Sequence, residues 1–282
     1  MTTTQPLVDL RSANQLRQAI FQAQPVALNH RVSGRALGEG PHLVLVHGIG
    51  SWLQAWDLLL PWLEQRFCVI TLDLRSHASS PMSPQPDFGL EHLVADLEAL
   101  RAHLGIERWA VAGHSLGGMI GPAYALAFPD RCQGVGLLST AAFRTDDDSA
   151  KVWALVNRME GEGIAPVLET LKARWFTEDF AAQNPDVVAQ RMQRVLATDP
   201  ASFLQVFRIY AGTEMSPWLG EVAAPCLVLT GEEDGGCNPR LNQQIHQALP
   251  HSNLMILPKL RHNILLESPQ AMAEALIDAF AS

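Results

Sequence analysis

Between about residue 40 and residue 140, short apolar runs alternate with amphipathic stretches. The runs are rich in β-branched and aliphatic side chains, which is typical of strands buried on both faces of a parallel sheet. The stretches between them carry apolar residues at helical spacing. The alternation predicts βαβ units, and therefore an α/β fold with a mostly parallel sheet flanked by helices. The expected strands cover residues 43–47, 67–73, 109–113 and 134–139, and the expected helices cover 52–65, 90–104 and 116–128.

This pattern is interrupted after residue 139 and resumes near residue 225. The intervening sequence is helical in character and contains no strand-like run. A connection this long within an α/β domain commonly covers a site. We therefore expect residues 1–143 and 221–282 to form the core, and residues 144–220 to form an inserted helical lid. Further elements are expected as strands at 26–32, 225–231 and 253–257, and as helices at 11–24, 239–249 and 269–280.

Composition and charge exclude several classes of protein. The chain has 282 residues, 48% of them hydrophobic and 17% charged, which suits a compact enzyme rather than a disordered chain. Its net charge is -9 and its only lysines are Lys151, Lys172 and Lys259, so no basic stripe exists for nucleic acid. The expected partner is a small-molecule substrate, and homo-oligomerisation stays open.

The sequence also indicates the cellular compartment. Residues 1–6 lack the basic and apolar regions of a secretory signal, and no stretch is apolar over the roughly 18 residues that a membrane span needs. The four cysteines have no C-x-x-C spacing, which favours buried free thiols in a reducing environment. We expect a cytoplasmic protein with no membrane association.

The strongest motif is Gly113-His-Ser-Leu-Gly-Gly118, which follows an expected strand and precedes an expected helix. A serine on such a sharp turn needs a strained backbone, and small residues two positions away on either side accommodate it. The five-residue pattern alone would also fit a glycine-rich turn with a helix-capping serine. Its position after the third parallel run favours Ser115 as an exposed nucleophile.

A serine hydroxyl needs a base within reach and a carboxylate that orients the base. His262 follows the last strand-like run, and Asp234 follows the run at 225–231, so both lie at carboxyl ends of expected strands. The chain order Ser, Asp, His is that of α/β-hydrolases. Glu232 and Glu233 are the competing carboxylates for the role of Asp234.

The sequence His47-Gly-Ile-Gly50 ends the first long strand-like run. By itself it fits an ordinary glycine turn. Together with the serine turn, it predicts an oxyanion hole formed by the backbone N–H groups of Ile49 and Leu116, each donor typically worth about 3 kcal/mol of transition-state stabilisation.

With these residues the chain resembles the α/β-hydrolase superfamily over essentially its whole length. The resemblance rests on His47-Gly48, Asp73-Leu-Arg75, Gly113 to Gly118, Asp234 and His262. One loop departs from the family pattern D-x-R-G-H-G-x-S, because Ser76 and Ala78 replace its two glycines. The departure leaves the conformation of this loop open, but not the nucleophile.

Within the superfamily, Ala173-Arg-Trp-Phe-Thr-Glu-Asp-Phe180 and Ala197-Thr-Asp-Pro200 are similar to 3-oxoadipate enol-lactonases and related hydrolases of enol-lactones or acylated enamines. The resemblance implies a small di-acid substrate from aromatic or heterocycle catabolism. Arg174 suits a substrate carboxylate, because a guanidinium binds it in a bidentate manner. Trp175 would wall the pocket, and Arg144 has a weaker claim. Alternatively, Trp175 only anchors a helix and Arg174 is solvated.

The predicted activity is hydrolysis of an ester, enol-lactone or amide bond through an acyl-enzyme on Ser115, without metal or organic cofactor. Carbon–carbon bond hydrolases of vinylogous diketones share the triad, although Gly-His-Ser-Leu-Gly differs from the G-N-S-x-G expected there. Cofactor-free dioxygenases and non-catalytic receptors on the same fold also stay open. Dehalogenases and epoxide hydrolases are disfavoured, because they carry an aspartate where this chain has Ser115.

Overall fold

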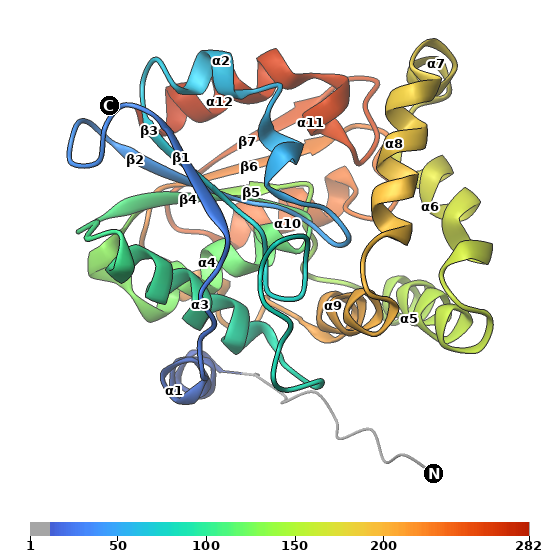
Figure 1. Cartoon of the computed structure of the whole chain (residues 1–282), viewed down its shortest axis with the longest axis horizontal. Coiled ribbons are helices and arrows are strands. Elements are labelled where there is room, and N and C mark those ends of the chain that lie inside the picture. Colours follow the sequence, from blue (N-terminus) through green and yellow to red (C-terminus); the bar gives the residue numbers. More distant parts are fainter. Residues whose placement is uncertain (1–11, 282) are drawn as a thin grey trace.

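The computed structural model describes residues 12–281 and is built around one seven-stranded sheet (Figure 1). The strand order is β1-β3-β2-β4-β5-β6-β7, in which only β1 runs antiparallel to its neighbour. The mostly parallel sheet predicted from the sequence is thus confirmed. The strands are β1 (His30–Gly34), β2 (His42–Val46), β3 (Cys68–Leu72), β4 (Trp109–His114), β5 (Cys132–Leu138), β6 (Cys226–Gly231) and β7 (Ser252–Leu257).

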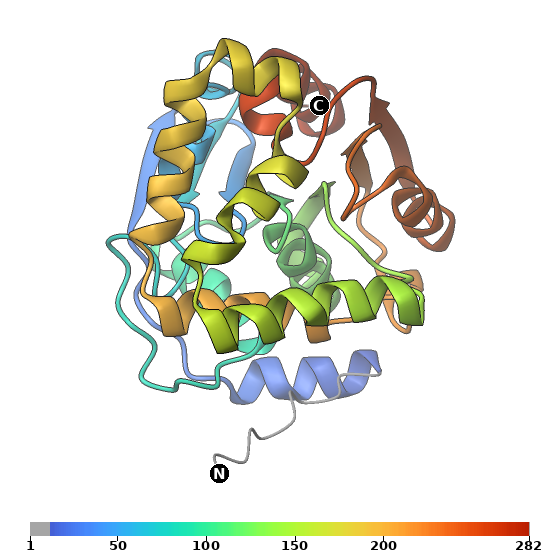
Figure 2. The ribbon, with the colours of Figure 1, turned by 90° about the vertical axis from the view of Figure 1, so that its right-hand side faces the viewer.

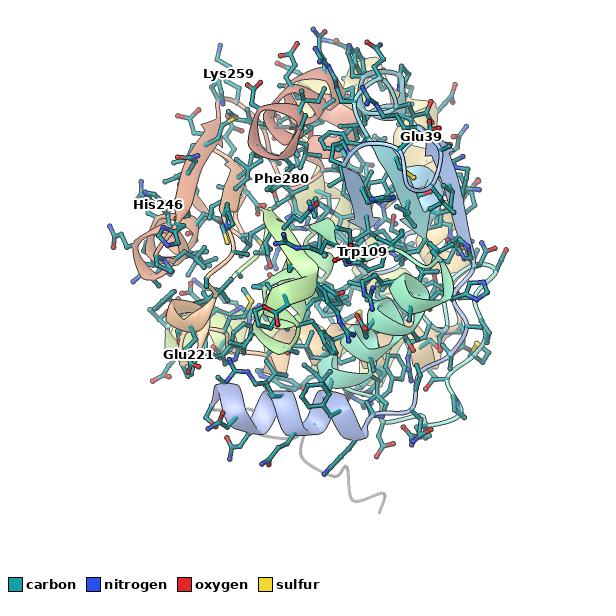
Figure 3. The ribbon with its side chains drawn as sticks, turned by 90° about the vertical axis from the view of Figure 1, so that its left-hand side faces the viewer. Glu39, Trp109, Glu221, His246, Lys259 and Phe280 are labelled. Atoms are coloured by element: carbon teal, nitrogen blue, oxygen red, sulfur yellow. The ribbon has the colours of Figure 1, made fainter. Side chains whose placement is uncertain are left out.

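Helices cover both faces of the sheet (Figure 1). One face carries α1 (Ala13–Gln22), α3 (Leu90–His103), α4 (Gly117–Ala127) and α10 (Pro239–Ala248), and the other carries α2 (Leu60–Leu63), α11 (Ile264–Glu267) and α12 (Pro269–Phe280). Every residue of β3 and β4 is therefore buried, which explains why these strands read as continuous apolar runs. Figure 3 shows Trp109 at the start of β4 and Phe280 at the end of α12.

Two predicted elements differ from the structure. The expected helix at 52–65 is a 3₁₀ turn (Leu53–Trp56) followed by the short α2, because Pro61 has no N–H to continue a helix. The expected strand at 26–32 begins only at His30, since the Val26 N–H donates to the Asp96 carboxylate at 2.7 Å. Residue 11 of the expected first helix and residues 1–6 lie outside the described residues.

Five helices lie between β5 and β6, and we refer to residues 144–220 as the insertion. They face the viewer in Figure 2 and stand beside one end of the sheet in Figure 1. Their bounds are α5 (Asp146–Glu162), α6 (Leu168–Trp175), α7 (Glu178–Gln183), α8 (Pro185–Leu196) and α9 (Pro200–Gly212). Further 3₁₀ turns span Pro129–Arg131, Ala165–Val167 and Leu219–Glu221.

The loop after β3 keeps a left-handed backbone at the two positions where glycine is replaced. Ser76 has φ of 60° and Ala78 has φ of 46°. Both residues accept a strain that glycine would avoid. Hydrogen bonds across the loop offset it, because Ser83 N–H donates to Ser76 Oγ at 2.8 Å and Ser80 Oγ donates to the Asp73 carbonyl at 2.6 Å. The loop therefore adopts a tight turn without its glycines.

Arg75 of this loop forms a buried, bidentate ion pair with Asp96 of α3. Its Nε and Nη2 each lie 2.7 Å from a carboxylate oxygen of Asp96. Both side chains are fully buried, with 0% of Arg75 and 1% of Asp96 exposed. Nη2 also donates to the Gln24 carbonyl at 3.0 Å. The pair fixes the loop after β3 to the helical layer.

No helix within residues 12–281 is long and apolar enough to cross a membrane. All four cysteines are buried and free, as the sequence predicts.

We predict that Asp96→Ala lowers the free energy of unfolding by about 3–5 kcal/mol, because it leaves the Arg75 charge buried and unpaired. Urea denaturation followed by circular dichroism measures the change. Asp147→Ala, which removes an exposed ion pair with Lys151, is the control and should leave the unfolding midpoint unchanged. Equal midpoints for wild type and Asp96→Ala would contradict a structural role for the buried pair.

Candidate active site

Ser115 occupies the turn between β4 and α4 and has a left-handed backbone, with φ of 57°. A Cβ atom added at Gly113 would lie 2.0 Å from the Gly117 carbonyl oxygen, and one added at Gly117 would lie 2.1 Å from the Val46 carbonyl oxygen. No side chain fits at either position. The Ser115 N–H donates to the Leu138 carbonyl at 2.8 Å, which fixes the turn to β5. The serine is therefore held by backbone contacts alone.

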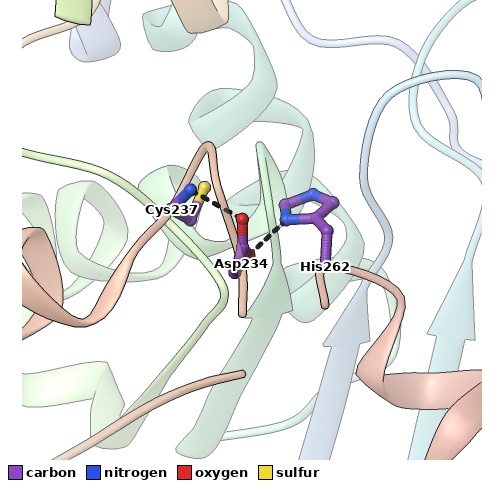
Figure 4. Close-up of side chains that lie close together, drawn as sticks. All are labelled: Asp234, Cys237 and His262. Atoms are coloured by element: carbon purple, nitrogen blue, oxygen red, sulfur yellow. Dashed lines mark hydrogen bonds and ion pairs between the residues drawn. The ribbon is translucent and has the colours of Figure 1, made fainter. Parts of the chain in front are cut away.

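Asp234 and His262 meet from two different loops, after β6 and after β7 (Figure 4). His262 Nδ1 lies 2.7 Å from Asp234 Oδ2. The other carboxylate oxygen accepts hydrogen bonds from the N–H groups of Gly236 and Cys237 at 2.9 and 2.8 Å. The carboxylate thus orients the imidazole with Nδ1 as the donor, which leaves Nε2 as the basic nitrogen.

The electrostatics of this pair favour a charged imidazole. Burial alone would raise the pKa of Asp234, but the charge of His262 and the hydrogen bonds to its carboxylate hold that pKa below its usual range. Burial alone would lower the pKa of His262, but the charge of Asp234 and the shared hydrogen bond raise it above the usual value. Asp234 therefore makes His262 a stronger base than a free histidine.

Neither competing carboxylate takes this position. Glu232 accepts a hydrogen bond from the Lys259 N–H at 3.0 Å. Glu233 is exposed and lies 3.9 Å from the Arg261 guanidinium. Of the three acidic residues in this loop, only Asp234 contacts His262.

His114, which precedes the serine, was not singled out from the sequence. Its Nε2 donates to the His262 carbonyl at 2.8 Å, and the two imidazole rings lie 4.9 Å apart. Burial, with a contribution from His262, lowers the pKa of His114 to about 3, so the ring is neutral. His114 thus supports the loop that carries His262 without competing for its proton. The x position of G-x-S-x-G carries no signal from which this role could be read.

The two predicted oxyanion donors are free to bind a ligand. The N–H groups of Ile49 and Leu116 donate to no acceptor among residues 12–281. The Cβ atom that Gly48 lacks would lie 3.0 Å from the Ser115 Cβ, so the loop containing Ile49 runs directly beside the serine. This arrangement is suited to stabilising negative charge near Ser115.

These groups open onto a cavity of about 410 Å³ between the sheet and the insertion. Ser115, Asp234 and His262 all line it. Most of the remaining wall is apolar, and the insertion supplies much of it through Val152, Leu155, Leu171, Val187, Phe207 and Tyr210. The cavity therefore suits a small organic substrate rather than a polymer.

The predicted substrate-binding residues divide between the cavity and its surroundings. Arg174 and Trp175 line the cavity, with Arg174 exposed at the rim. Arg144 does not line it. Its guanidinium lies 4.5 Å from the centre of the Tyr210 ring and donates to the Thr213 carbonyl at 3.1 Å. Arg144 therefore braces the base of the insertion.

Two cavity arginines were missed in the sequence. Arg191 and Arg194 lie one turn apart on α8 and both line the cavity. Each guanidinium stacks on a tryptophan, Arg191 on Trp175 at 4.5 Å and Arg194 on Trp52 at 4.6 Å. Within the described part of the chain neither forms an ion pair with a carboxylate. Their spacing in the sequence predicts that they share one face of a helix, but it does not predict that this face lines the cavity.

The loop that carries His262 is also attached to the insertion. Arg261 Nη1 donates to the carbonyls of Ala173 and Phe176 at 2.8 and 2.9 Å. The Asn263 N–H donates to the Trp175 carbonyl at 2.8 Å. The end of α6 therefore helps to fix the residues on both sides of His262.

Asp234, Cys237 and His262 offer ligand atoms that all lie within 4.8 Å of one another, so these residues could hold a metal ion. A metal would have to replace the hydrogen bond between Asp234 and His262. The site geometry is therefore that of an oriented histidine, and a cofactor-free site stays a prediction.

Comparisons with known proteins identify the family of this fold. The family model described as the alpha/beta hydrolase fold matches residues 41–269. 3-Oxoadipate enol-lactonase 2 of Acinetobacter baylyi is 28% identical over 90% of this chain and 93% of its own length. The (E)-2-((N-methylformamido)methylene)succinate hydrolase of the same organism is 25% identical over 85% of this chain and 90% of its own length.

Among solved structures, the enol-lactonase from Burkholderia xenovorans superposes with a TM-score of 0.81. It is 25% identical and the match covers 89% of this chain and 95% of that chain. The family match runs from just before β2 to the start of α12 and therefore includes the elements that carry the candidate site. The chain belongs to the α/β-hydrolase fold family and is a hydrolase similar to enol-lactonases.

Proposed function

We propose that this hydrolase uses Ser115, His262 and Asp234 to cleave an ester, enol-lactone or amide bond of a small, carboxylate-bearing metabolite. The observation that carries the proposal is the 2.7 Å hydrogen bond between His262 and the buried Asp234 at the wall of the cavity that Ser115 lines. A serine hydroxyl is activated by an oriented base within its reach, and Ser115 and His262 line the same cavity. The insertion, as the lid over this cavity, would limit the access of bulk water to the site.

The mechanism follows from the roles of these atoms. His262 Nε2 takes the hydroxyl proton while Ser115 Oγ attacks the acyl carbon, and the carbonyl oxygen becomes an oxyanion held by the N–H groups of Ile49 and Leu116. Collapse breaks the bond to the leaving group, which receives the proton from His262. Water then attacks the acyl-enzyme with His262 again as base, and the acid product and free Ser115 are released.

Ser115→Ala should lower kcat for ester or lactone hydrolysis about 10⁶-fold and abolish labelling by a fluorophosphonate, because it removes the nucleophile. Mass spectrometry of the intact protein measures labelling, which should reach one probe per wild-type chain. Ser79→Ala, at an exposed serine, is the control and should label fully. Wild-type rates in Ser115→Ala would exclude this nucleophile.

The raised pKa of His262 predicts the pH dependence. Because the base must be neutral, kcat/KM should rise with pH through a pKa above the usual histidine value of 6.5. Asp234→Asn removes the charge that raises the pKa, so the acid limb should move to lower pH while kcat falls about 10⁴-fold. Glu233→Gln, in the same loop, is the control and should keep the wild-type profile. An acid limb unchanged in Asp234→Asn would separate Asp234 from the base.

Charge in the cavity supports a substrate carboxylate. Asp234 pairs with His262, and the other acidic residue of the wall, Asp57, pairs with Arg31. Arg174 and Arg194 therefore contribute positive charge that no carboxylate among residues 12–281 neutralises. A relative named for a succinate derivative and relatives named enol-lactonases are consistent with an acidic substrate.

We predict that mono-p-nitrophenyl glutarate is hydrolysed with a kcat/KM about 10- to 100-fold higher than its methyl ester, the range expected for a hydrogen bond to a charged group. Arg174→Ala and Arg194→Met should raise KM for the acid and leave KM for the methyl ester unchanged. Release of p-nitrophenol measures both rates. Arg158→Met, at an exposed arginine of α5, is the control. Equal rates for acid and ester would remove both arginines from substrate binding.

A further inference from the structure

Arg191 of the insertion reaches across the cavity to the loop that carries the proposed oxyanion donor. Its Nη1 donates to the Gly50 carbonyl at 2.8 Å, and its Nη2 donates to the Ile49 carbonyl at 3.0 Å. One planar guanidinium thus binds two consecutive carbonyl groups. This contact joins α8 to residues 47–50 of the core.

The other polar groups of this loop are held by two histidines. His47 Nδ1 donates to the Gly48 carbonyl at 2.8 Å, while its Nε2 accepts from the Leu74 N–H at 3.0 Å. The Gly50 N–H donates to His77 Nε2 at 3.3 Å. Burial holds the pKa of His47 well below its usual range and lowers the pKa of His77 to about 4, so both rings are neutral.

Every backbone N–H and carbonyl group from the Gly48 carbonyl to the Gly50 carbonyl therefore has a hydrogen-bond partner within residues 12–281, except the Ile49 N–H. The histidines come from the core, whereas the two carbonyls that follow this N–H depend on Arg191. Gly50 is left-handed, with φ of 58°, so the chain turns sharply after Ile49 where both carbonyls bind Arg191. The Ile49 N–H lies in the peptide plane before the Ile49 Cα, and Arg191 binds the carbonyl of the plane after it. The guanidinium therefore limits the backbone rotation at Ile49 that would reorient the donor.

The charge of Arg191 has few other partners. Burial and the neighbouring Arg194 lower the pKa of Arg191 to about 10, so it stays charged at neutral pH. A buried charge is costly unless it is paired or fully hydrogen-bonded. The compensation comes from the two loop carbonyls and from the face of Trp175, and Nη1 and Nη2 are already engaged before any substrate binds. Arg191 differs in this respect from Arg194, whose Nε has no partner among the described residues.

We propose that Arg191 is a positioning residue for the oxyanion hole, acting through the carbonyls of Ile49 and Gly50 rather than on the substrate. The inference rests on the proposed serine hydrolase mechanism. Apolar side chains of the insertion pack against the same loop. A Cβ atom added at Gly50 would lie 2.5 Å from the Phe203 ring and 3.6 Å from Val195, so both side chains lie directly over this glycine. The insertion would then contribute to transition-state stabilisation as well as to the cavity wall.

The test compares Arg191→Lys and Arg191→Met with the wild type, using p-nitrophenyl acetate as substrate and phenyl trifluoromethyl ketone as inhibitor. Ser115 Oγ adds to the carbonyl carbon of the ketone, its proton passes to His262, and the carbonyl oxygen becomes an oxyanion in the hole. The Ki of the ketone therefore reports the geometry of the donors. We expect kcat to fall about 10- to 100-fold, the range for a misplaced or weakened oxyanion donor, and Ki to rise by the same factor. KM should change less than about threefold, because acylation and deacylation both pass through an oxyanion and slow together, while ground-state binding is unchanged.

The Lys variant keeps the charge but not the planar fork, so it should lose nearly as much activity as the Met variant. Arg158→Met is the control for an arginine of the insertion that does not line the cavity. Thermal melts measure folding, and if Arg191→Met does not fold, Arg191→Lys carries the test.

Unchanged kcat and Ki in both variants would overturn the inference. A rise of KM confined to mono-p-nitrophenyl glutarate, with kcat unchanged, would also overturn it, because Arg191 would then bind the substrate carboxylate. If the wild type neither hydrolyses p-nitrophenyl acetate nor reacts with a fluorophosphonate, the proposed function itself fails and the inference falls with it. A wild type that reacts while the variants match it refutes only the role of Arg191.

Discussion

The structure depends on a close contact between three backbone segments, at the ends of β4 and β2 and the start of α4, with no side chain between them. At the end of β4, the Gly113 Cα faces the Gly117 carbonyl, and Gly117 in turn faces the Val46 carbonyl at the end of β2. This contact brings the helix α4 directly onto two adjacent strands. It also holds Ser115 in the left-handed conformation. Any side chain at either glycine would separate the strand from the helix, and the serine would lose the geometry that exposes it.

The close approach organises the rest of the site, because adjacent parallel strands end at the same edge of the sheet. The end of β2 leads into the loop with Ile49, next to the serine, and the ends of β6 and β7 lead to Asp234 and His262. Burial then amplifies the electrostatics. The same desolvation that keeps His114 neutral also strengthens the attraction between Asp234 and His262.

The insertion is attached to both halves of this site. Arg261 and Asn263 connect the residues around His262 to α6, and Arg191 connects the loop of residues 47–50 to α8. The two arginines donate from their guanidinium groups and Asn263 donates from its backbone N–H, in each case to backbone carbonyls. Such bonds are directional and therefore transmit position. A segment that only covered the cavity could do so with apolar contacts. Here the insertion is also part of the framework that orients the core loops.

The sequence by itself determined the sheet, the order of the core elements and the turn that presents Ser115, because these follow from local spacing of apolar residues and glycines. The sequence proposed Asp234 from its place after a strand and from the chain order, but left Glu232 and Glu233 as competitors. Only the hydrogen bond to His262 distinguished Asp234 from them. The tertiary structure alone decided which arginines line the cavity. Arg191 and Arg194 have the spacing of any helix face, and Arg144 is as basic as Arg174. Which of them meets the cavity depends on how α8 packs against loops more than 100 residues away in the chain, and local sequence patterns do not encode contacts over that distance.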